Sequence, residues 1–189
     1  MPVADIIDDV ANFNSNLGVL LINNTSEELC KKILDSKNLS FVPLYKLTDN
    51  INLRVDHPLA HIEPFPFEKL SRYMFIKYSE GKNAELSYMP ELKSLNIINP
   101  DKIISVSDRN LKCSITSETD AFGVGCTLHP EFMSHYKITA IPIPDNFAIL
   151  GYIYIKNSHL SAEAKEFIAL LKEELSEFSK KSPQHISVI

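Results

Sequence analysis

The stretch of sequence that decides the fold is residues 53–60, which read Leu53-Arg54-Val55-Asp56-His57-Pro58-Leu59-Ala60. Its opening residues end the strand-like stretch 51–55. The pattern of residues changes after His57-Pro58, because Pro64 and Pro66 mark an irregular connection. We therefore expect the chain to pass from one part of the fold to another at this point.

The elements expected before this point alternate between helix and strand. Thr25 and Glu28 form a capping box, which predicts a helix through Leu34 because each side chain can satisfy a backbone donor of the first turn. The full set is a helix over 3–13, a strand over 18–22, the helix through Leu34, and strands over 40–47 and 51–55. This order is typical of a parallel sheet.

A second alternation of strands and helices is expected after this point. The sequence predicts a helical turn at 67–70, strands at 74–78, 103–106 and 124–128, helices at 85–95 and from Ser107 or Asp108 to about Thr119, and a turn at 130–135. Phe122-Gly123-Val124-Gly125 is interpreted as a tight turn into a strand. Strands at 138–143 and 148–155, with a turn signal at 144–146, predict a hairpin. Ser161 caps a long final helix, and a tail follows Lys181.

Composition excludes several classes of protein. A hydrophobic fraction of 44% is enough for a real core. With a net charge of −5 and scattered basic residues, the chain by itself should not bind a nucleic-acid backbone. Cys30, Cys113 and Cys126 lie too far apart for a disulfide framework or zinc site. No signal peptide or membrane span of about 20 apolar residues is evident, so a soluble, cytoplasmic protein is expected.

The motifs of catalysis are also missing. The sequence has no nucleophile elbow, no phosphate-binding loop and no dinucleotide fingerprint. His57 and His61 have the spacing of two metal ligands on a helix, but Pro58 between them and Pro64 after them break such a helix. We therefore expect neither an enzyme nor a bound metal or cofactor.

The stretch at 53–60 resembles the regulatory domains of LysR-type transcriptional regulators, which carry a strand followed by His-Pro-Leu-Ala at this place. Further matches follow in the right order. They are Leu17-Gly18-Val19, which resembles the family's Asp-Leu-Gly strand, Ala121-Phe122-Gly123-Val124-Gly125 with Pro130, and the Leu160-Ser161 entry into the closing helix with Phe167-Ile168 and Leu171. The resemblance covers roughly residues 3 to 175.

The resemblance implies an α/β fold of the periplasmic-binding-protein-like type 2. Two α/β lobes would be joined by crossover strands, with residues 1–52 and 142–189 in an outer lobe and 53–141 in an inner lobe. A small effector would bind in the cleft between them. The family's helix-turn-helix head has no counterpart in the sequence given, and the outer lobe is expected to lack its first strand–helix–strand. The implied function is effector sensing that controls transcription.

Ligands of open α/β lobes collect at the carboxyl ends of strands and at helix N-termini. Lys77 and Arg109 would suit an anionic effector, since arginine can bind a carboxylate with two bonds. The competing interpretation of many candidates, including His129, is that they cap helices and turns. The full set of candidate ligand-binding residues is Asn23, Asn24, Thr25, Lys77, Ser79, Ser107, Asp108, Arg109, Asn110, Thr127 and His129.

Two alternatives stay open at this stage. The chain could act as a headless paralogue that oligomerises with full-length regulators, or as a small α/β enzyme with an unrecognised site. The resemblance also implies self-association, because regulatory domains of this family form dimers and often tetramers. The expected partners are therefore a small-molecule effector and either further copies of the chain or a full-length regulator.

Overall fold

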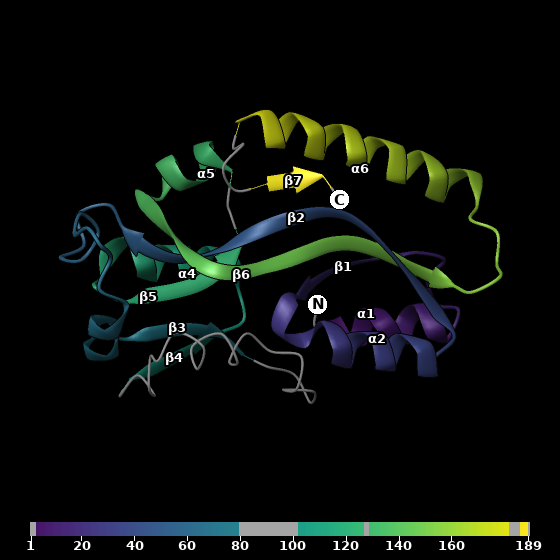
Figure 1. The fold of residues 1–189 in the computed structure, drawn as a ribbon, viewed down its shortest axis with the longest axis horizontal. Helices are drawn as coiled ribbons and strands as arrows, with labels where there is room; N and C mark the ends of the chain where they lie inside the picture. The colour runs from purple at the N-terminus through teal and green to yellow at the C-terminus, as the bar shows by residue number, and fades with distance from the viewer. Residues whose placement is uncertain (1–2, 80–101, 127–128, 182–185, 189) are drawn as a thin grey trace. The chain divides into compact units, whose positions relative to one another are not determined.

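The computed structural model of this 189-residue chain describes residues 3–79, 102–126, 129–181 and 186–188 (Figure 1). Its helices are α1 (Val3–Ala11), α2 (Glu27–Ser36), α4 (Arg109–Glu118), α5 (Pro130–His135) and α6 (Ala162–Lys181), with short 3₁₀ helices η1 (Asn24–Ser26) and η2 (Phe67–Arg72). Its strands are β1 (Gly18–Asn23), β2 (Leu39–Arg54), β3 (Phe75–Tyr78), β4 (Ile103–Val106), β5 (Phe122–Cys126), β6 (Ile138–Ile155) and β7 (Ile186–Val188). The helix expected at 85–95 lies outside the described residues.

The chain forms two compact units. The first contains the described residues of 1–47 and 147–189, and the second contains those of 48–79 and 102–146. The chain passes between the units within β2 and within β6, a few residues from the lobe boundaries that the resemblance implies. The assignment of the units as outer and inner lobes stays a prediction.

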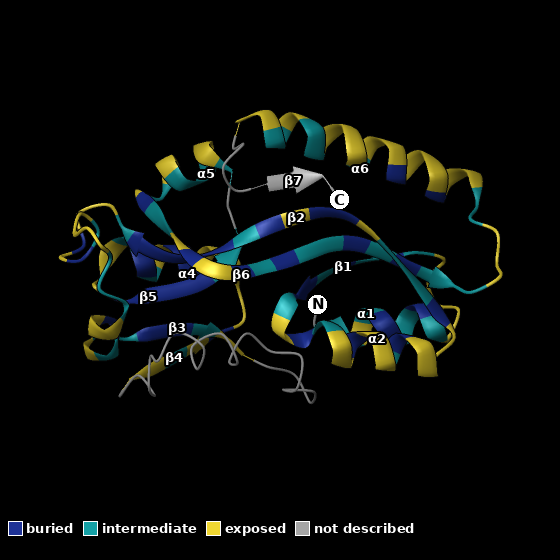
Figure 2. Cartoon of the chain, in the orientation of Figure 1, coloured by how far each residue is buried: buried dark blue, intermediate teal, exposed yellow. Residues whose placement is uncertain are grey.

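The first unit is built around the antiparallel pair of β1 and β6, whose register runs from Gly18 opposite Ile153 to Asn23 opposite Ala148. The apolar faces of the two N-terminal helices close its core because their apolar residues recur at helical spacing. This core comprises Ile7, Val10, Leu20, Ile22, Cys30, Leu34, Leu39 and Ile153. In contrast, α6 buries only Ala164 and Ile168 among its described residues, and most of it is exposed (Figure 2).

The second unit combines antiparallel and parallel pairing. The end of β2 pairs antiparallel with β5, from Asp49 opposite Cys126 to Asn52 opposite Gly123. In turn, β3 pairs parallel with both β5 and β4. The main core lies on one face of these strands and comprises Ile51, Leu53, Leu59, Leu70, Phe75, Phe122, Val124 and Ile143. The hydrogen-bonded order of the whole sheet is β1-β6-β2-β5-β3-β4, with β7 paired to β2.

Several expectations about the strands were wrong. The stretches 40–47 and 51–55 form one strand, β2, because its intervening polar residues stay in the ladder, with Asp49 and Asn50 fully buried. The expected hairpin is instead one strand, β6, which accommodates its turn signal at a single left-handed residue, Asp145, with a φ of 58°. Aspartate tolerates this conformation better than most residues. The expected tail contains β7, which pairs with β2.

Two further local expectations were wrong. Parallel pairing was expected for the strands before His57, but β1 pairs antiparallel with β6 and β2 antiparallel with β5. The partner of β1 comes from residues 148–153, and no local pattern could indicate a pairing at that distance in sequence. The Gly123-x-Gly125 segment is not a turn, since both glycines lie inside β5. No described helix is long and apolar enough to cross a membrane.

Candidate functional site

The strands β3, β4 and β5 of the second unit run parallel, so their carboxyl ends meet at one edge of the sheet. We call this the carboxyl edge and define it by the last residues of the three strands, Tyr78, Val106 and Cys126. Ligands of open α/β sheets bind at such edges, where backbone donors of the following helices are available. Seven of the described candidate residues lie on or directly after these strands: Lys77, Ser79, Ser107, Asp108, Arg109, Asn110 and His129.

The candidates that follow β4 are built into the start of α4. Asp108 is the N-cap of that helix, and its Oδ1 accepts a hydrogen bond of 2.9 Å from the backbone N–H of Leu111. The Arg109 guanidinium lies over the ring of Phe132 at 4.5 Å from its centroid. Asn110 Oδ1 accepts a 3.3 Å hydrogen bond from the Tyr136 hydroxyl. The contacts of Arg109 and Asn110 join the N-terminus of α4 to α5.

The other described candidates of the second unit lie on β3, directly after β3 and at the start of α5. Lys77 lies on β3 and is half-buried, and the backbone N–H of Ser79 donates to Val106 O at 2.7 Å. His129 is the N-cap of α5, where its Nδ1 accepts from the backbone N–H of Glu131 at 3.3 Å. The sequence left two interpretations of His129 open, capping and ligand contact, and this hydrogen bond is the capping one. Thr127 lies outside the described residues.

The candidates of the first unit form a local turn after β1. Asn23 Oδ1 accepts from the backbone N–H of Thr25 at 2.9 Å and from its hydroxyl at 2.7 Å, and Asn24 lies inside η1. The expected capping box of Thr25 and Glu28 was wrong, because the Thr25 hydroxyl is directed back to Asn23 and α2 begins only at Glu27. The turn is therefore capped by Asn23, two residues before Thr25.

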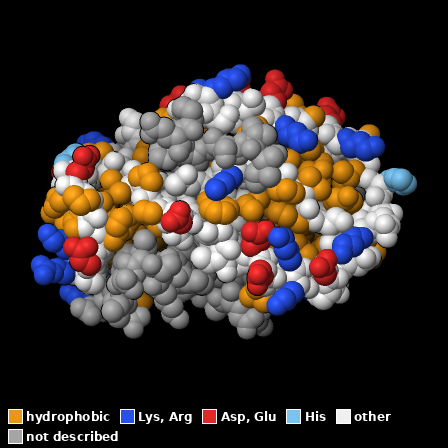
Figure 3. Space-filling view, viewed as in Figure 1, with side chains coloured by type: hydrophobic (Ala, Val, Ile, Leu, Met, Phe, Trp, Pro, Cys, Tyr) orange, Lys and Arg blue, Asp and Glu red, His pale blue; other side chains and the backbone are white. Residues whose placement is uncertain are grey.

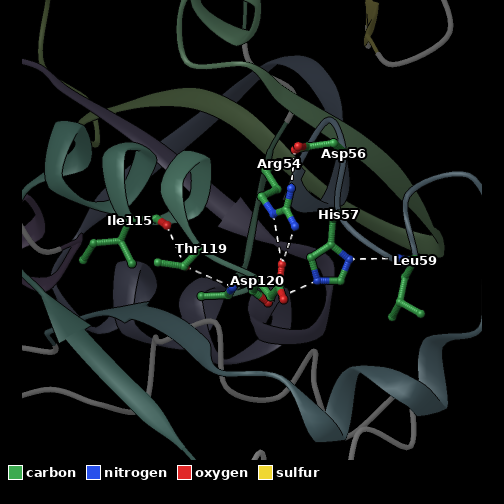
Figure 4. A network of polar contacts seen from close by, with 8 residues as sticks. Arg54, Asp56, His57, Leu59, Ile115, Thr119 and Asp120 are labelled. Carbon is green, nitrogen blue, oxygen red and sulfur yellow. Dashed lines mark hydrogen bonds and ion pairs between the residues drawn. The ribbon is translucent and has the colours of Figure 1, made fainter.

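The His-Pro-Leu-Ala segment takes part in a network of polar contacts in the second unit (Figure 4). His57 is almost fully buried, its Nδ1 accepts from the backbone N–H of Leu59 at 3.0 Å, and its Nε2 lies 3.1 Å from Asp120 O. Arg54 donates to Asp120 Oδ1 from Nε at 2.9 Å and from Nη2 at 2.7 Å, and also pairs with Asp56. The network therefore ties the end of β2 to the segment that leads from α4 into β5.

A buried polar face beside this edge was missed by the sequence analysis. Lys112 of α4 is only 8% exposed, and its Nζ donates a 2.7 Å hydrogen bond to Val124 O. The same ammonium lies 4.6 Å from the ring centroid of Tyr78, a cation–π contact. Asn52 of β2 is 7% exposed. Lys112 and Asn52 both approach the glycines of β5.

Only one sequence signal could have found this face. Gly123 and Gly125 are two residues apart on a strand, so they lie on the same side of the sheet and leave it without side chains. A Cβ at Gly123 would lie 2.7 Å from Lys112 Cε, so the lysine stem occupies the space that the glycine provides. A lysine inside an amphipathic helix otherwise looks like a surface residue.

The Cys113 thiol of α4 is buried and weakly reactive. Burial raises the pKa of Cys113, and burial likewise raises the pKa of Tyr78 and of Cys30, the last to about 11. Because the thiolate is the nucleophile, such thiols are weakly reactive at neutral pH. Within the described ranges, no cluster of three or more His, Cys, Asp or Glu side chains could hold a metal ion.

No protein-family model and no curated protein matches the chain. Solved structures do match it. The effector-binding domain of QuiR in complex with shikimate is 18% identical with a TM-score of 0.66, and the match covers 92% of this chain and 78% of that one. The CcmR regulatory domain of Synechocystis in complex with 2-PG is 14% identical with a TM-score of 0.66, covering 92% and 80%.

The chain is also similar to a longer solved structure, that of HinK, a LysR family transcriptional regulator from Pseudomonas aeruginosa. HinK is 14% identical to this chain, with a TM-score of 0.64. The match covers 90% of this chain and 56% of HinK, so this chain spans little more than half of that regulator. At these identities the comparisons establish the fold. It is the periplasmic-binding-protein-like type 2 fold of LysR regulatory domains, as the resemblance implied.

Proposed function

We propose that this chain, which has the fold of LysR-family regulatory domains, is itself a domain of that family that senses a small-molecule effector. The observation that carries the proposal is the carboxyl edge of β3, β4 and β5, at which α4 begins, with Lys77 near the end of β3 and Arg109 as the first residue of α4. Effector binding would control transcription when the domain is joined to, or paired with, a DNA-binding head.

The effector is proposed to be a small anion. Two of the structurally similar domains were solved with small molecules, QuiR with shikimate and CcmR with 2-PG. In this chain, Lys77 lies on β3 and Arg109 opens α4, and backbone N–H groups of α4 add the positive end of a helix dipole. In the first unit, Asn23, Asn24 and Thr25 at the end of β1 are proposed as further ligand contacts.

The experiment that tests the proposal is a thermal-shift screen of small carboxylates and phosphates against the purified chain. A ligand that binds only the folded state raises the midpoint of unfolding. Failure of every anion to stabilise the chain, even at millimolar concentration, would contradict the proposal. Turnover of any of these compounds would favour the alternative of an unrecognised enzyme.

Arg109→Ala should weaken the binding of such an anion about tenfold or more, which corresponds to roughly 1.4 kcal/mol. The physical reason is that a guanidinium can bind a carboxylate with two hydrogen bonds, and Arg109 lies at the start of α4 over the Phe132 ring. Calorimetry measures the change. Arg72→Ala is the matched control, because Arg72 is an exposed arginine of the same unit on η2. Equal affinity in the Arg109 variant and the wild type would exclude this role.

The partners beyond the effector are proposals as well. This chain spans 56% of HinK, so we assign DNA binding to a separate head and not to this chain. We propose self-association or pairing with a full-length regulator as the route by which binding is reported. A cytoplasmic location follows from that role.

A further inference from the structure

The end of β2 and the whole of β5 present two chemically different faces. Ile51 and Leu53 face the main core of the second unit together with Phe122 and Val124. Side chains alternate along a strand, so the residues between them face the other side. On that side Asn52 lies opposite Gly123 in the ladder, and Asn50 lies opposite Gly125. This second face therefore carries two asparagines beside two positions with no side chain.

Lys112 extends across this second face. Its stem passes so close to Gly123 that a Cβ there would lie 2.7 Å from Lys112 Cε, and its ammonium reaches Val124 O at 2.7 Å and the face of the Tyr78 ring. Burying a lysine ammonium costs free energy, because it gives up most of its hydration. The fold nevertheless places Lys112 at 8% exposure and uses a glycine to make room for it.

Asn52 has one polar atom that is not used. Its Oδ1 is buried and accepts no hydrogen bond among the residues that the structure describes. A buried acceptor without a donor is costly, and such groups in folded proteins call for an explanation. The oxygen and nitrogen of an asparagine amide can be exchanged by a flip, so Asn52 offers one donor and one acceptor to this face in either orientation.

Gly125 lies next to both groups. It is half-buried near the carboxyl end of β5, whereas the neighbouring Asn52 and Lys112 are buried. A Cβ at Gly125 would lie 3.7 Å from Asn52 Nδ2 and 4.0 Å from Lys112 Nζ. A ligand atom over Gly125 would therefore lie close to both nitrogens.

We propose that Lys112, Asn52 and Gly125 form a subsite for a small hydroxy acid. The ligand's carboxylate accepts from the Lys112 ammonium, and its hydroxyl donates to the free acceptor of Asn52. The inference rests on the proposed effector-sensing function and adds to it a buried anchor with a defined chemistry. The subsite differs from Arg109, which is exposed and lies over Phe132.

Two variants separate this subsite from the rest of the fold. Lys112→Met keeps the apolar stem beside Gly123 and removes the charge. Gly125→Ala leaves Lys112 and Asn52 intact but places a methyl group at the proposed point of contact, at ordinary van der Waals distances from both. Lys69→Met is the matched control, because Lys69 is an exposed lysine of η2 in the same unit.

The probes are lactate, malate, quinate and shikimate, each measured by calorimetry with the whole chain at up to millimolar concentration. Propionate and succinate are the counterparts of lactate and malate without the hydroxyl. We expect at least one hydroxy acid to bind, Lys112→Met and Gly125→Ala each to weaken it more than about tenfold, and Lys69→Met to leave it unchanged. The wild type should bind propionate and succinate more weakly than lactate and malate. The Asn52→Ala variant should bind the compounds of each pair equally.

Other outcomes overturn the inference in distinguishable ways. Equal affinity in the wild type, Lys112→Met and Gly125→Ala overturns the subsite and leaves effector sensing intact. The same holds if only non-hydroxylated anions bind, through Arg109. If no small anion stabilises the wild type, both the subsite and the proposed function fail. Thermal melting without ligand shows whether each variant folds. If Lys112→Met does not fold, the affinity of Gly125→Ala decides whether the subsite exists.

Discussion

His57 is held in its neutral form by hydrogen bonds at both ring nitrogens. Its Nδ1 accepts from the backbone N–H of Leu59, so the ring proton lies on Nε2 and is donated to Asp120 O (Figure 4). Adding a second proton at Nδ1 would break the bond to Leu59. Burial lowers the pKa of His57 below its ordinary value of 6.5, although the nearby Asp120 backbone oxygen opposes that shift and Arg54 adds to it.

This arrangement predicts that the chain loses stability in mild acid. The unfolded chain protonates His57 near pH 6.5, whereas the folded chain resists protonation to a lower pH. The contribution is therefore fully present above about pH 6.5, and it is lost as the pH falls towards the folded-state pKa. The free energy of unfolding should fall by up to about 1.4 kcal/mol for each pH unit in that range.

Urea denaturation at several pH values between 7.5 and 5 measures this slope. His57→Asn is the informative control, because asparagine can accept from Leu59 but does not titrate. The variant should be less stable at neutral pH and show a flatter dependence on pH. A variant with the same slope as the wild type would assign the acid sensitivity to other groups.

Lys112 shows why single residues were misjudged in the sequence. A lysine in an amphipathic helix is normally solvated, and nothing local marks this one as buried. Its burial depends on the glycines of β5, whose nearest one, Gly123, is 11 positions away in the printed sequence (112 to 123). The candidates at helix starts were easier to identify, and Asp108 and His129 serve as the N-caps that their positions suggested.

At the scale of elements, β2 and β6 are each longer than the sequence indicated, and they pack closely in the first unit. At Gly151 of β6 the neighbouring atoms leave no room for a side chain. A Cβ there would lie 2.5 Å from the ring of Phe41 and 2.5 Å from the backbone oxygen of Val42. The ring could turn aside, but a backbone oxygen cannot move without disturbing β2.

Gly151→Ala is therefore predicted to destabilise the chain by roughly 1–3 kcal/mol or more, the usual cost of overpacking a core. Thermal or urea unfolding measures the loss. Gly125→Ala is the matched control, since it is the same change in a strand, where the nearest atom to the new Cβ is 3.7 Å away. That variant should unfold within about 1 kcal/mol of the wild type. If the two variants were equally stable, the close approach of Phe41 and Val42 would be refuted.

At the scale of the whole molecule, the charge distribution bears on what the chain can bind by itself. The net charge is −5, and on the face shown in Figure 3 the Lys and Arg side chains lie among Asp and Glu side chains. Proteins that bind a nucleic-acid backbone usually concentrate basic residues in a stripe or on one face. The visible face shows no such concentration among the described residues.

We therefore predict that the chain alone does not bind duplex DNA. Fluorescence anisotropy of a labelled duplex, at about physiological salt, should show no saturable binding at protein concentrations up to roughly 100 μM, the weak end of non-specific affinities. The measurement should be repeated with the effector present. Tight binding by the chain alone would contradict the assignment of DNA binding to a separate head.

The sequence by itself determined the alternation of helices and strands and the candidate positions at strand ends, and it indicated the fold class through the resemblance of several segments in order, the one at 53–60 among them. These are local properties, because caps, apolar periodicity and prolines act within a few residues. Only the tertiary structure decided that β1 pairs with β6, that β2 and β6 are continuous, and that Lys112 and Asn52 meet at Gly125. Each of these depends on contacts between distant segments, whose free energy is set by packing and hydrogen bonding that no local pattern records.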